Sequence, residues 1–449
     1  MFDLKVFVLN FIFSLSLSLG VSAQAATPVD LQSIARPPQF VLISFDGSYS
    51  DQFWKESFNL AEKDNARFSY FVSGVYFVER KDSKLYKPPG HSVGASDIGF
   101  ADNDLGDIQT RTENVWQAIK RNFDIASHVN GHFDGSGWTE SQWASEFLQF
   151  ESFVENVFSL YPALKESFAD QWQKSLDQEL KGFRAPLLAE SEGLSKTLEK
   201  MKYTYDASKI LNSQWPYQMN NGVWNIGLSE IELIGTNRRT IAMDYNVLYG
   251  QCNGKFNPKN GGECANLSPD ILTRDLDQTY QSYIAAFLKS YYGNRAPISI
   301  GHHFSLFNRG IYWRALQKFT YSVCNLPEVK CITHSDLVEW MESQKQKFGP
   351  HFSSKLNLAH FDRGGVSSSV QQSFASLLPR SNLLDLQGLT SQIEMNAEEI
   401  FRQATSPEAD EVQVQMLKGD LPEAHLHEHE KMNLKKHRID LLHINRDIK

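Results

Sequence analysis

Apolar runs of strand length recur along the chain and are separated by longer amphipathic stretches. Residues 39–45 are almost continuously apolar and end at Asp46-Gly47-Ser48, a turn-forming sequence, which predicts a strand buried on both faces. Comparable runs predict strands at 68–73, 123–126 and 297–303. The intervening periodicity predicts helical segments at 51–64, 107–121, 140–180, 268–291, 311–322 and 335–346. Strands that alternate with helices are typical of a parallel α/β architecture.

Polar residues gather directly after these apolar runs. Asp46, His128, Arg184 and His302 each follow or end a predicted strand. Because parallel strands end at the same edge of a sheet, these side chains are expected at one edge, where α/β barrels carry their chemistry.

The two ends of the chain differ in pattern from the middle. An apolar stretch at 6–21 is followed by Ala23-Gln24-Ala25, a small-x-small pattern that predicts a secretory signal peptide over 1–25, with an uncleaved anchor as the alternative. Residues 26–347 are predicted to form the catalytic domain. Residues 348–449 are predicted to be a helical or disordered extension, because their pattern becomes polar and irregular.

Composition excludes some partners. The 449 residues carry a net charge of -9 and no basic block stands out, which argues against nucleic acid and anionic membranes as partners. No second apolar run is long enough for a membrane span, so no stable membrane insertion is expected after signal cleavage.

The four cysteines form two pairs that are local in sequence. In an exported protein they predict the disulfides Cys252–Cys264 and Cys324–Cys331. A zinc site built from all four thiolates is the rival interpretation, although the usual Cys-x-x-Cys spacing is missing. Export and paired cysteines together favour a periplasmic or secreted location.

His128 and His132 lie four residues apart in the sequence SHVNGH. Two imidazoles at this spacing, on a helical turn or a tight loop, can face one divalent cation. Taken alone, the pair is equally compatible with ordinary surface or core histidines.

Four short motifs, taken in order, resemble the polysaccharide deacetylase family of carbohydrate esterases. They are FDG at 45–47, HVNGH at 128–132, FRAP at 183–186 and IGHH at 300–303, and the resemblance covers roughly residues 38 to 345. It implies a distorted, incomplete (β/α) barrel of the polysaccharide deacetylase type, followed here by the C-terminal extension.

The resemblance also implies roles for individual residues. Asp46 matches the family's catalytic base and Arg184 the arginine that orients it. His128 and His132 match two metal ligands, for a divalent metal that is Zn2+, with Co2+ or Mn2+ as alternatives. His302 matches the general acid, and His303 takes that role if the alignment is shifted by one residue.

One departure from the family pattern concerns the third metal ligand. The family has a second Asp where the gapless match places Gly47. A one-residue deletion would instead make Asp46 the ligand and leave no base. In the gapless match, water, substrate or a nearby carboxylate must complete the site, and Asp51 and Asp134 are the candidates in sequence.

Each assignment has a structural alternative. Asp46 is also a common turn former, Arg184 a possible structural ion-pair partner, and His302 and His303 possible core histidines. Trp138, Trp224, Phe304 and Phe307 are candidates for stacking on sugar rings, although aromatic residues serve as core residues equally often.

The sequence therefore predicts a metal-dependent hydrolase that removes acetyl groups from N-acetylglucosamine residues of a polysaccharide, either peptidoglycan or a chitin-like polymer. A catalytically weakened carbohydrate-binding relative and an O-acetyl esterase acting on another polysaccharide are the alternatives.

Overall fold

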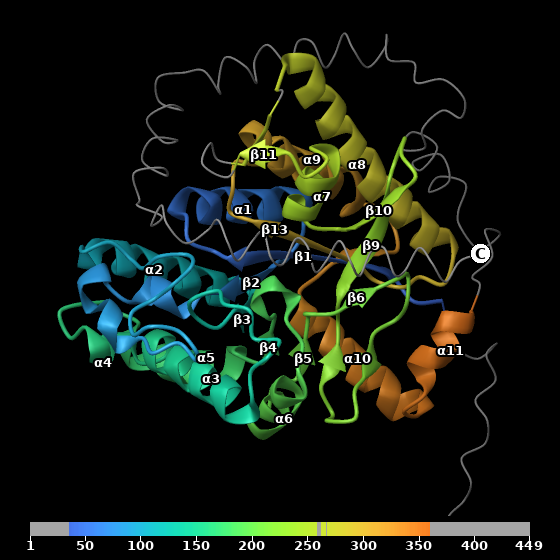
Figure 1. The fold of residues 1–449 in the computed structure, drawn as a ribbon. Helices are drawn as coiled ribbons and strands as arrows, with labels where there is room; N and C mark the ends of the chain where they lie inside the picture. Colours follow the sequence, from blue (N-terminus) through green and yellow to red (C-terminus); the bar gives the residue numbers. More distant parts are fainter. Residues whose placement is uncertain (1–35, 258–261, 266, 360–449) are drawn as a thin grey trace, which may run out of the picture. The chain divides into compact units, whose positions relative to one another are not determined.

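The computed structural model describes residues 36–257, 262–265 and 267–359 of the chain (Figure 1). The predicted signal peptide and most of the predicted C-terminal extension lie outside these residues. The described residues belong to one compact unit.

The centre of the unit is an open, curled sheet. All neighbouring pairs along its main path are parallel except β8 and β7. In order the strands are β13 (Ile298–His303), β1 (Gln39–Gly47), β2 (Ser69–Val72), β3 (Asp124–Ser127), β4 (Gly182–Phe183), β5 (Tyr205–Asp206), β8 (Trp224–Asn225) and β7 (Tyr217–Gln218). A further strand, β14 (Val329–Cys331), pairs with β1. Because the end strands β13 and β7 are not neighbours, the predicted incomplete (β/α) barrel is confirmed.

Smaller strands lie outside this sheet. One group is a three-stranded sheet of β10 (Arg238–Ile241), β9 (Leu228–Leu233) and β6 (Ile210–Leu211). A two-stranded hairpin is made by β11 (Phe256–Asn257) and β12 (Glu263–Cys264).

Most helices cover the outer face of the sheet (Figure 1). The amphipathic segment predicted at 51–64 is a helix over the same residues, and the stretch at 140–180 divides into three helices. The helices are α1 (Asp51–Asp64), α2 (Leu105–Lys120), α3 (Glu140–Val154), α4 (Val157–Leu160), α5 (Ala169–Glu179), α6 (Glu192–Lys200), α7 (Asp244–Gln251), α8 (Pro269–Tyr292), α9 (Phe307–Val323), α10 (His334–Phe348) and α11 (Phe352–Leu358). Short 3-10 turns, η2 (Gly74–Phe77), η3 (Arg80–Leu85) and η4 (Pro186–Leu188), follow β2 and β4.

The two faces of β1 carry different side chains. Val41, Ile43 and Phe45 belong to the large apolar cluster that the strand shares with α1 and α9. Since side chains alternate along a strand, Ser44 and Asp46 point to the opposite, concave face. The polar end of β1 is therefore directed into the interior of the curled sheet.

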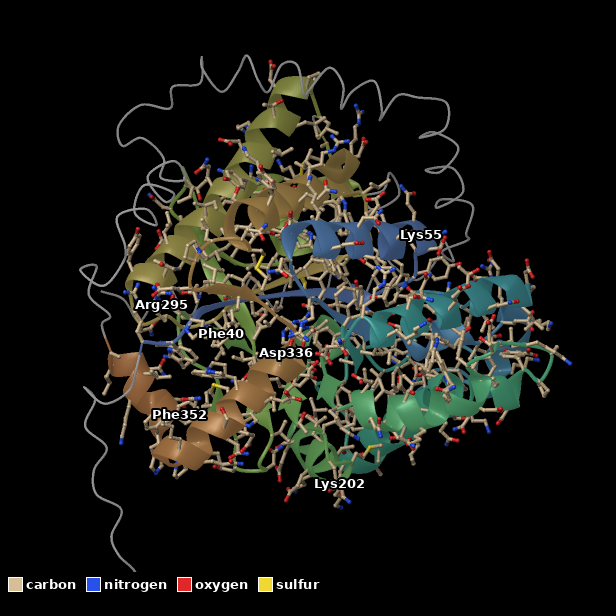
Figure 2. All side chains as sticks on the ribbon, turned by 180° about the vertical axis from the view of Figure 1, so that it is seen from behind. Phe40, Lys55, Lys202, Arg295, Asp336 and Phe352 are labelled. Carbon is tan, nitrogen blue, oxygen red and sulfur yellow. A yellow bond between two sulfur atoms is a disulfide. The ribbon has the colours of Figure 1, made fainter. Side chains whose placement is uncertain are left out.

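Helix α10 packs against the concave face. The ring of Phe40, from β1, lies 5.0 Å from that of Trp340 in α10, and the Phe352 ring of α11 lies 6.4 Å from the Trp340 ring. Figure 2 labels Phe40 and Phe352. Helix α11, which begins beyond the domain boundary predicted at residue 347, therefore packs against α10.

Both predicted disulfides are present, Cys252–Cys264 and Cys324–Cys331, so the four thiolates do not form a zinc site. Among the residues that the structure describes, no helix is both long and apolar enough to cross a membrane.

Candidate active site

Asp46 and Arg184 form a buried ion pair at the carboxyl end of the sheet. Arg184 follows β4, and its Nη1 atom lies 2.7 Å from Asp46 Oδ1 and donates a second hydrogen bond to Ser44 at 2.8 Å. Burial by itself would raise the pKa of Asp46, but the charge and hydrogen bond of Arg184 act together with the nearby His128 and His303, and the pKa is lowered. Asp46 is therefore held ionised, with Oδ1 bound and Oδ2 left for another partner.

His128 and His132 lie on a tight loop after β3, with ring centroids 5.3 Å apart. His128 Nδ1 is 2.8 Å from the carbonyl oxygen of Arg184. A carbonyl only accepts, so Nδ1 carries the proton and Nε2 keeps its lone pair. Burial lowers the pKa of His128, and lowers that of His132 to about 3. Both rings are thus neutral, the form in which imidazole binds a metal.

Side chains from a neighbouring helix hold this loop in shape. Glu146 of α3 accepts a hydrogen bond from the Asn130 backbone N–H at 3.2 Å and one from the Tyr86 hydroxyl at 2.7 Å. The Asn130 side chain donates to the Glu146 carbonyl oxygen at 2.8 Å, and the Gly131 N–H donates to the Tyr86 hydroxyl at 3.1 Å. The backbone between the two histidines is therefore fixed by a buried polar network.

His303, at the end of β13, pairs with Asp244 at the start of α7. Its Nδ1 atom is 2.7 Å from Asp244 Oδ1, and its backbone N–H donates to Oδ2 at 2.9 Å. Burial would lower the pKa of His303, but the charge and hydrogen bond of Asp244, together with the charge of Asp46, raise the pKa overall. Since Nδ1 is engaged by Asp244, Nε2 is left for the site.

His302 has different surroundings. It is the cross-strand partner of Phe45, whereas His303 is the partner of Asp46. Its Nε2 atom lies 3.1 Å from the Tyr283 hydroxyl of α8, and burial lowers its pKa to about 4. His302 thus points toward the outer helices and away from Asp46, which does not fit the general-acid role that the sequence match gave it.

The register of β1 and β13 brings the two pairs together. Asp46 and His303 are opposite each other on neighbouring parallel strands, so their side chains lie on the same face. Asp46 also lies close enough to His128 and His132 for its charge to act on the pKa of each ring. The structure therefore gathers Asp46, Arg184, His128, His132 and His303 at one edge of the sheet, whereas His302, which was expected there with Asp46, His128 and Arg184, faces the outer helices.

The side chains offered to a divalent cation are two neutral imidazoles and, beside them, the Asp46 carboxylate. His128 is oriented through its Nδ1–H by a backbone carbonyl, a typical arrangement for a metal-binding histidine. Over the described ranges, no cluster of three His, Cys, Asp or Glu side chains has the geometry of a complete metal site. His128 and His132 therefore fit a divalent cation that has two protein ligands and whose other coordination positions are open.

Among the described residues, neither acidic residue proposed as a replacement for the third ligand joins His128 and His132 in a metal-binding cluster. Asp51 is bound by Lys55 at 2.7 Å and by Asn114 at 2.9 Å. Asp134 accepts the N–H of Ser136 within its own turn. Both oxygens of Asp51 are therefore engaged by other groups, and Asp134 bonds within its own turn.

Two aromatic residues predicted to stack on sugars, Trp138 and Trp224, are core residues instead, and a third, Phe304, is half-buried against the core. Trp138 is 8% exposed and packs against Trp143, with ring centroids 4.9 Å apart. Trp224 is 2% exposed and donates to Glu342 at 2.7 Å. Phe304 packs on the outer aromatic cluster, 5.1 Å from Phe45. Phe307 is different, because its ring lies 6.1 Å from that of His303.

The structure adds Asp244 to the candidate functional residues, through its contact with His303. It follows an apolar run, Ile241-Ala242-Met243, which is the same signal that singled out Asp46. Its importance depends on its contact with His303, 59 positions away, and spacing in the sequence does not reveal that contact.

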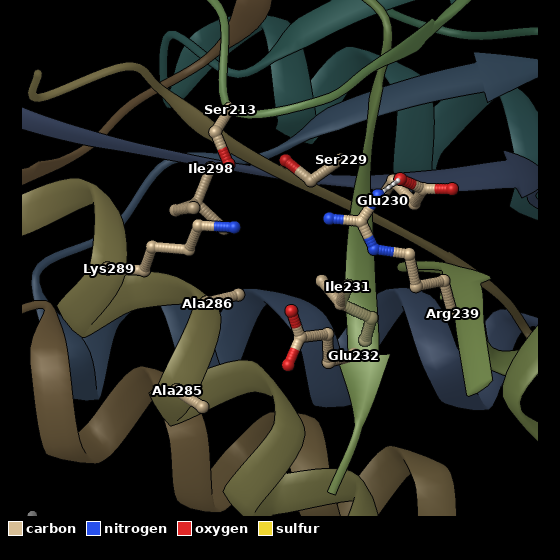
Figure 3. Close-up of a pocket in the computed structure, with 10 residues that line it drawn as sticks. All are labelled: Ser213, Ser229, Glu230, Ile231, Glu232, Arg239, Ala285, Ala286, Lys289 and Ile298. Atoms are coloured by element: carbon tan, nitrogen blue, oxygen red, sulfur yellow. Dashed lines mark ion pairs between the residues drawn. The ribbon is translucent and has the colours of Figure 1, made fainter. Parts of the chain in front are cut away.

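A separate cavity lies between β9 and α8, and none of its lining residues belongs to the site (Figure 3). Its polar rim includes the Arg239–Glu230 ion pair, at 2.9 Å. The lining residues are Ser213, Ser229, Glu230, Ile231, Glu232, Arg239, Ala285, Ala286, Lys289 and Ile298.

No protein-family model matches the sequence, and no curated protein matches it. Solved structures do match. A protein from Mycobacterium smegmatis described as a polysaccharide deacetylase is 14% identical with a TM-score of 0.42, over 71% of this chain and 96% of that one. A peptidoglycan deacetylase from Bacillus subtilis is 11% identical with a TM-score of 0.34, over 71% and 96%.

A carbohydrate esterase family 4 pseudoenzyme from Bacillus anthracis is 7% identical with a TM-score of 0.34, over 67% of this chain and 66% of that one. These matches name the family that the sequence motifs resemble. Because every TM-score is below 0.5, the function of the chain is argued below from its own residues.

Proposed function

We propose that the protein is a secreted, metal-dependent deacetylase that removes acetyl groups from N-acetylglucosamine residues of a polysaccharide, either peptidoglycan or a chitin-like polymer. The observation that carries this proposal is the pairing across β1 and β13. An ionised Asp46 and a protonatable His303 share one face beside two neutral histidines.

Asp46 is the general base. A water held at the site gives its proton to Oδ2, because Oδ1 is bound by Arg184. The lowered pKa ensures that the carboxylate is ionised at neutral pH, and Arg184 fixes its direction. Arg184 thus acts as a positioning residue for the base.

His303, in place of His302, is the general acid. Amine departure from the tetrahedral intermediate requires a proton on nitrogen, and the Nε2–H of His303 supplies it. Asp244 holds the ring by Nδ1 and favours the protonated form. The same arrangement of base and acid also suits hydrolysis of an O-acetyl ester. The alcohol of an ester is a better leaving group than an amine, so its departure depends less on proton donation by His303.

His128 and His132 would hold the cation, as Zn2+, Co2+ or Mn2+. Bound there, a divalent ion would supply Lewis-acid polarisation of the acetyl carbonyl and lower the pKa of water. The two histidines are suited to this because burial keeps both rings unprotonated. Two disulfides support the proposed periplasmic or secreted location.

The direct test is acetate release from N-acetylglucosamine oligomers and from peptidoglycan, with and without a chelator. We expect release from at least one of these substrates, its loss on chelation, and its recovery on adding Zn2+ or Co2+. Release that survives thorough chelation would contradict the metal-dependent mechanism. Acetate from O-acetylated xylan alone would favour the esterase.

A carbohydrate-binding relative with weakened catalysis is the second candidate, favoured by Gly47 in the position of the third ligand. Glycan binding without acetate release, by pure protein free of divalent metal, would support this alternative.

A further inference from the structure

The space beside Gly47, where the family's third metal ligand is expected, is lined by two hydroxyl groups. Gly47 has a φ of 75°, and a Cβ atom built on it would lie 3.6 Å from the Tyr76 ring. That Cβ would lie 3.9 Å from the Tyr76 hydroxyl oxygen and 4.0 Å from Ser73 Oγ. The side chain of an aspartate at position 47 would therefore extend from a Cβ atom that lies within 4.0 Å of both hydroxyl oxygens.

Ser73 follows β2, which lies between β1, the strand that carries Asp46, and β3, the strand that His128 follows. Its backbone N–H donates to the Gly47 carbonyl oxygen at 3.3 Å, while the His128 N–H donates to the neighbouring Val72 carbonyl oxygen at 2.9 Å. Its side chain is fully buried, and among the described residues Ser73 Oγ has no hydrogen-bond partner. An unpartnered buried hydroxyl is costly, and beside Gly47 the Ser73 Oγ atom is free to bind an ion or a water.

Tyr76 is held in place from behind. Arg111 donates to its backbone carbonyl oxygen, and the Arg111 guanidinium lies 5.7 Å from the Tyr76 ring centre. Tyr49 packs on the same ring at 4.8 Å. These contacts fix the ring, so its hydroxyl faces the Gly47 position in a set orientation.

We propose that the hydroxyls of Ser73 and Tyr76 take the place of the missing carboxylate and complete, directly or through bound water, the coordination of the cation held by His128 and His132. This inference rests on the proposed metal dependence and concerns the part of the site that the sequence left unexplained. Hydroxyl oxygens are neutral donors, so the site carries one negative charge fewer than with an aspartate at position 47. It therefore binds a divalent cation more weakly than a site with that carboxylate.

The experiment is calorimetric titration of the metal-free protein with Zn2+ and, separately, with Co2+, which also gives a visible spectrum. Ser73→Ala and Tyr76→Phe each remove one oxygen and are expected to weaken binding about tenfold, the usual lower bound for loss of a group that supports a metal site. Ser73→Thr keeps the hydroxyl and is expected to bind like the wild type.

Two further variants sharpen the test. Ser290→Ala is the matched control, because Ser290 in α8 is also a buried serine whose Oγ has no partner among the described residues; its metal affinity should equal that of the wild type. Gly47→Asp introduces the carboxylate at a left-handed position, which Asp tolerates better than most residues, and into ordinary contact distance of Tyr76. It should bind at least about tenfold more tightly and make the Ser73→Ala change nearly neutral.

The outcomes separate this inference from the proposed function. Unchanged affinity in both Ser73→Ala and Tyr76→Phe would overturn the inference and leave metal dependence standing. No binding of Zn2+ or Co2+ by the wild type would overturn both. Weakened binding in the two variants, in a wild type that releases no acetate from any acetylated glycan, would support the inference while contradicting deacetylation.

Discussion

At the scale of single residues, the Asp244 carboxylate decides how far up the pH scale His303 remains protonated. Activity needs an ionised Asp46, whose pKa is lowered, and a protonated His303, whose pKa is raised. The active range therefore lies between the two, and its alkaline limit follows His303. The acid and base roles are set by opposite shifts of two neighbouring groups.

Asp244→Asn removes the largest of the charges that oppose the effect of burial on His303, so the pKa of His303 falls. The alkaline limb of the kcat/KM profile should move to lower pH, and activity at pH 8 should drop roughly tenfold or more. The acid limb, which follows Asp46, should stay in place. An alkaline limb that does not move would show that Asp244 does not act through the protonation of His303.

Glu146 provides a second residue-scale prediction, concerning stability. Burial raises its pKa to about 7 from an ordinary value of 4.5, despite hydrogen bonds from Tyr86 and Asn130. Because folding favours the neutral acid, its contribution is complete below the unfolded pKa and is lost as the pH rises through about 7. The free energy of unfolding should fall by up to about 3 kcal/mol over this range.

Urea unfolding at pH 4.5 and pH 7.5 tests this. In Glu146→Gln the side chain cannot ionise, so the fall in stability between the two pH values should be smaller than in the wild type. Equal pH dependence in the two proteins would contradict the account of Glu146.

At the scale of elements, α11 belongs to the folded domain. Phe352 and Leu356 are buried, and Asn357 Oδ1 accepts the N–H of Trp215 at 2.6 Å. A chain ending at residue 347 loses these contacts, whereas one ending at residue 359 keeps them. Removing two buried apolar side chains costs on the order of 3 kcal/mol or more.

The chain ending at residue 347 should therefore melt at least about 5 °C below the chain ending at residue 359. Calorimetric Tm values for the two truncated proteins provide the measurement. Equal Tm values would show that α11 is only loosely attached.

The elements also show what periodicity can and cannot predict. The helix at 51–64 and the strand at 39–45 follow from local apolar patterns, and the structure has both. The choice between His302 and His303 does not follow from such a pattern, because an almost wholly apolar run carries no alternation to mark its faces. That choice depends on the register of β13 against β1, which is a tertiary property.

At the scale of the whole molecule, the strand-end rule located most of the site. Asp46, His128 and Arg184 come from separated segments, yet each ends a strand of one parallel sheet, so the fold brings them to one edge. The roles of Trp138 and Trp224 were wrong because helices added elsewhere in the chain bury them. Ser73 was missed because a lone serine after a strand has no distinctive spacing.

The measurement that tests the central claim most directly is acetate release by the metal-loaded wild type and by the two adjacent variants His303→Gln and His302→Gln, each checked for folding. We predict that His303→Gln loses about a hundredfold or more, as expected for removal of a general acid, and that His302→Gln loses far less. A His303→Gln protein that keeps wild-type activity while His302→Gln loses it would contradict the account.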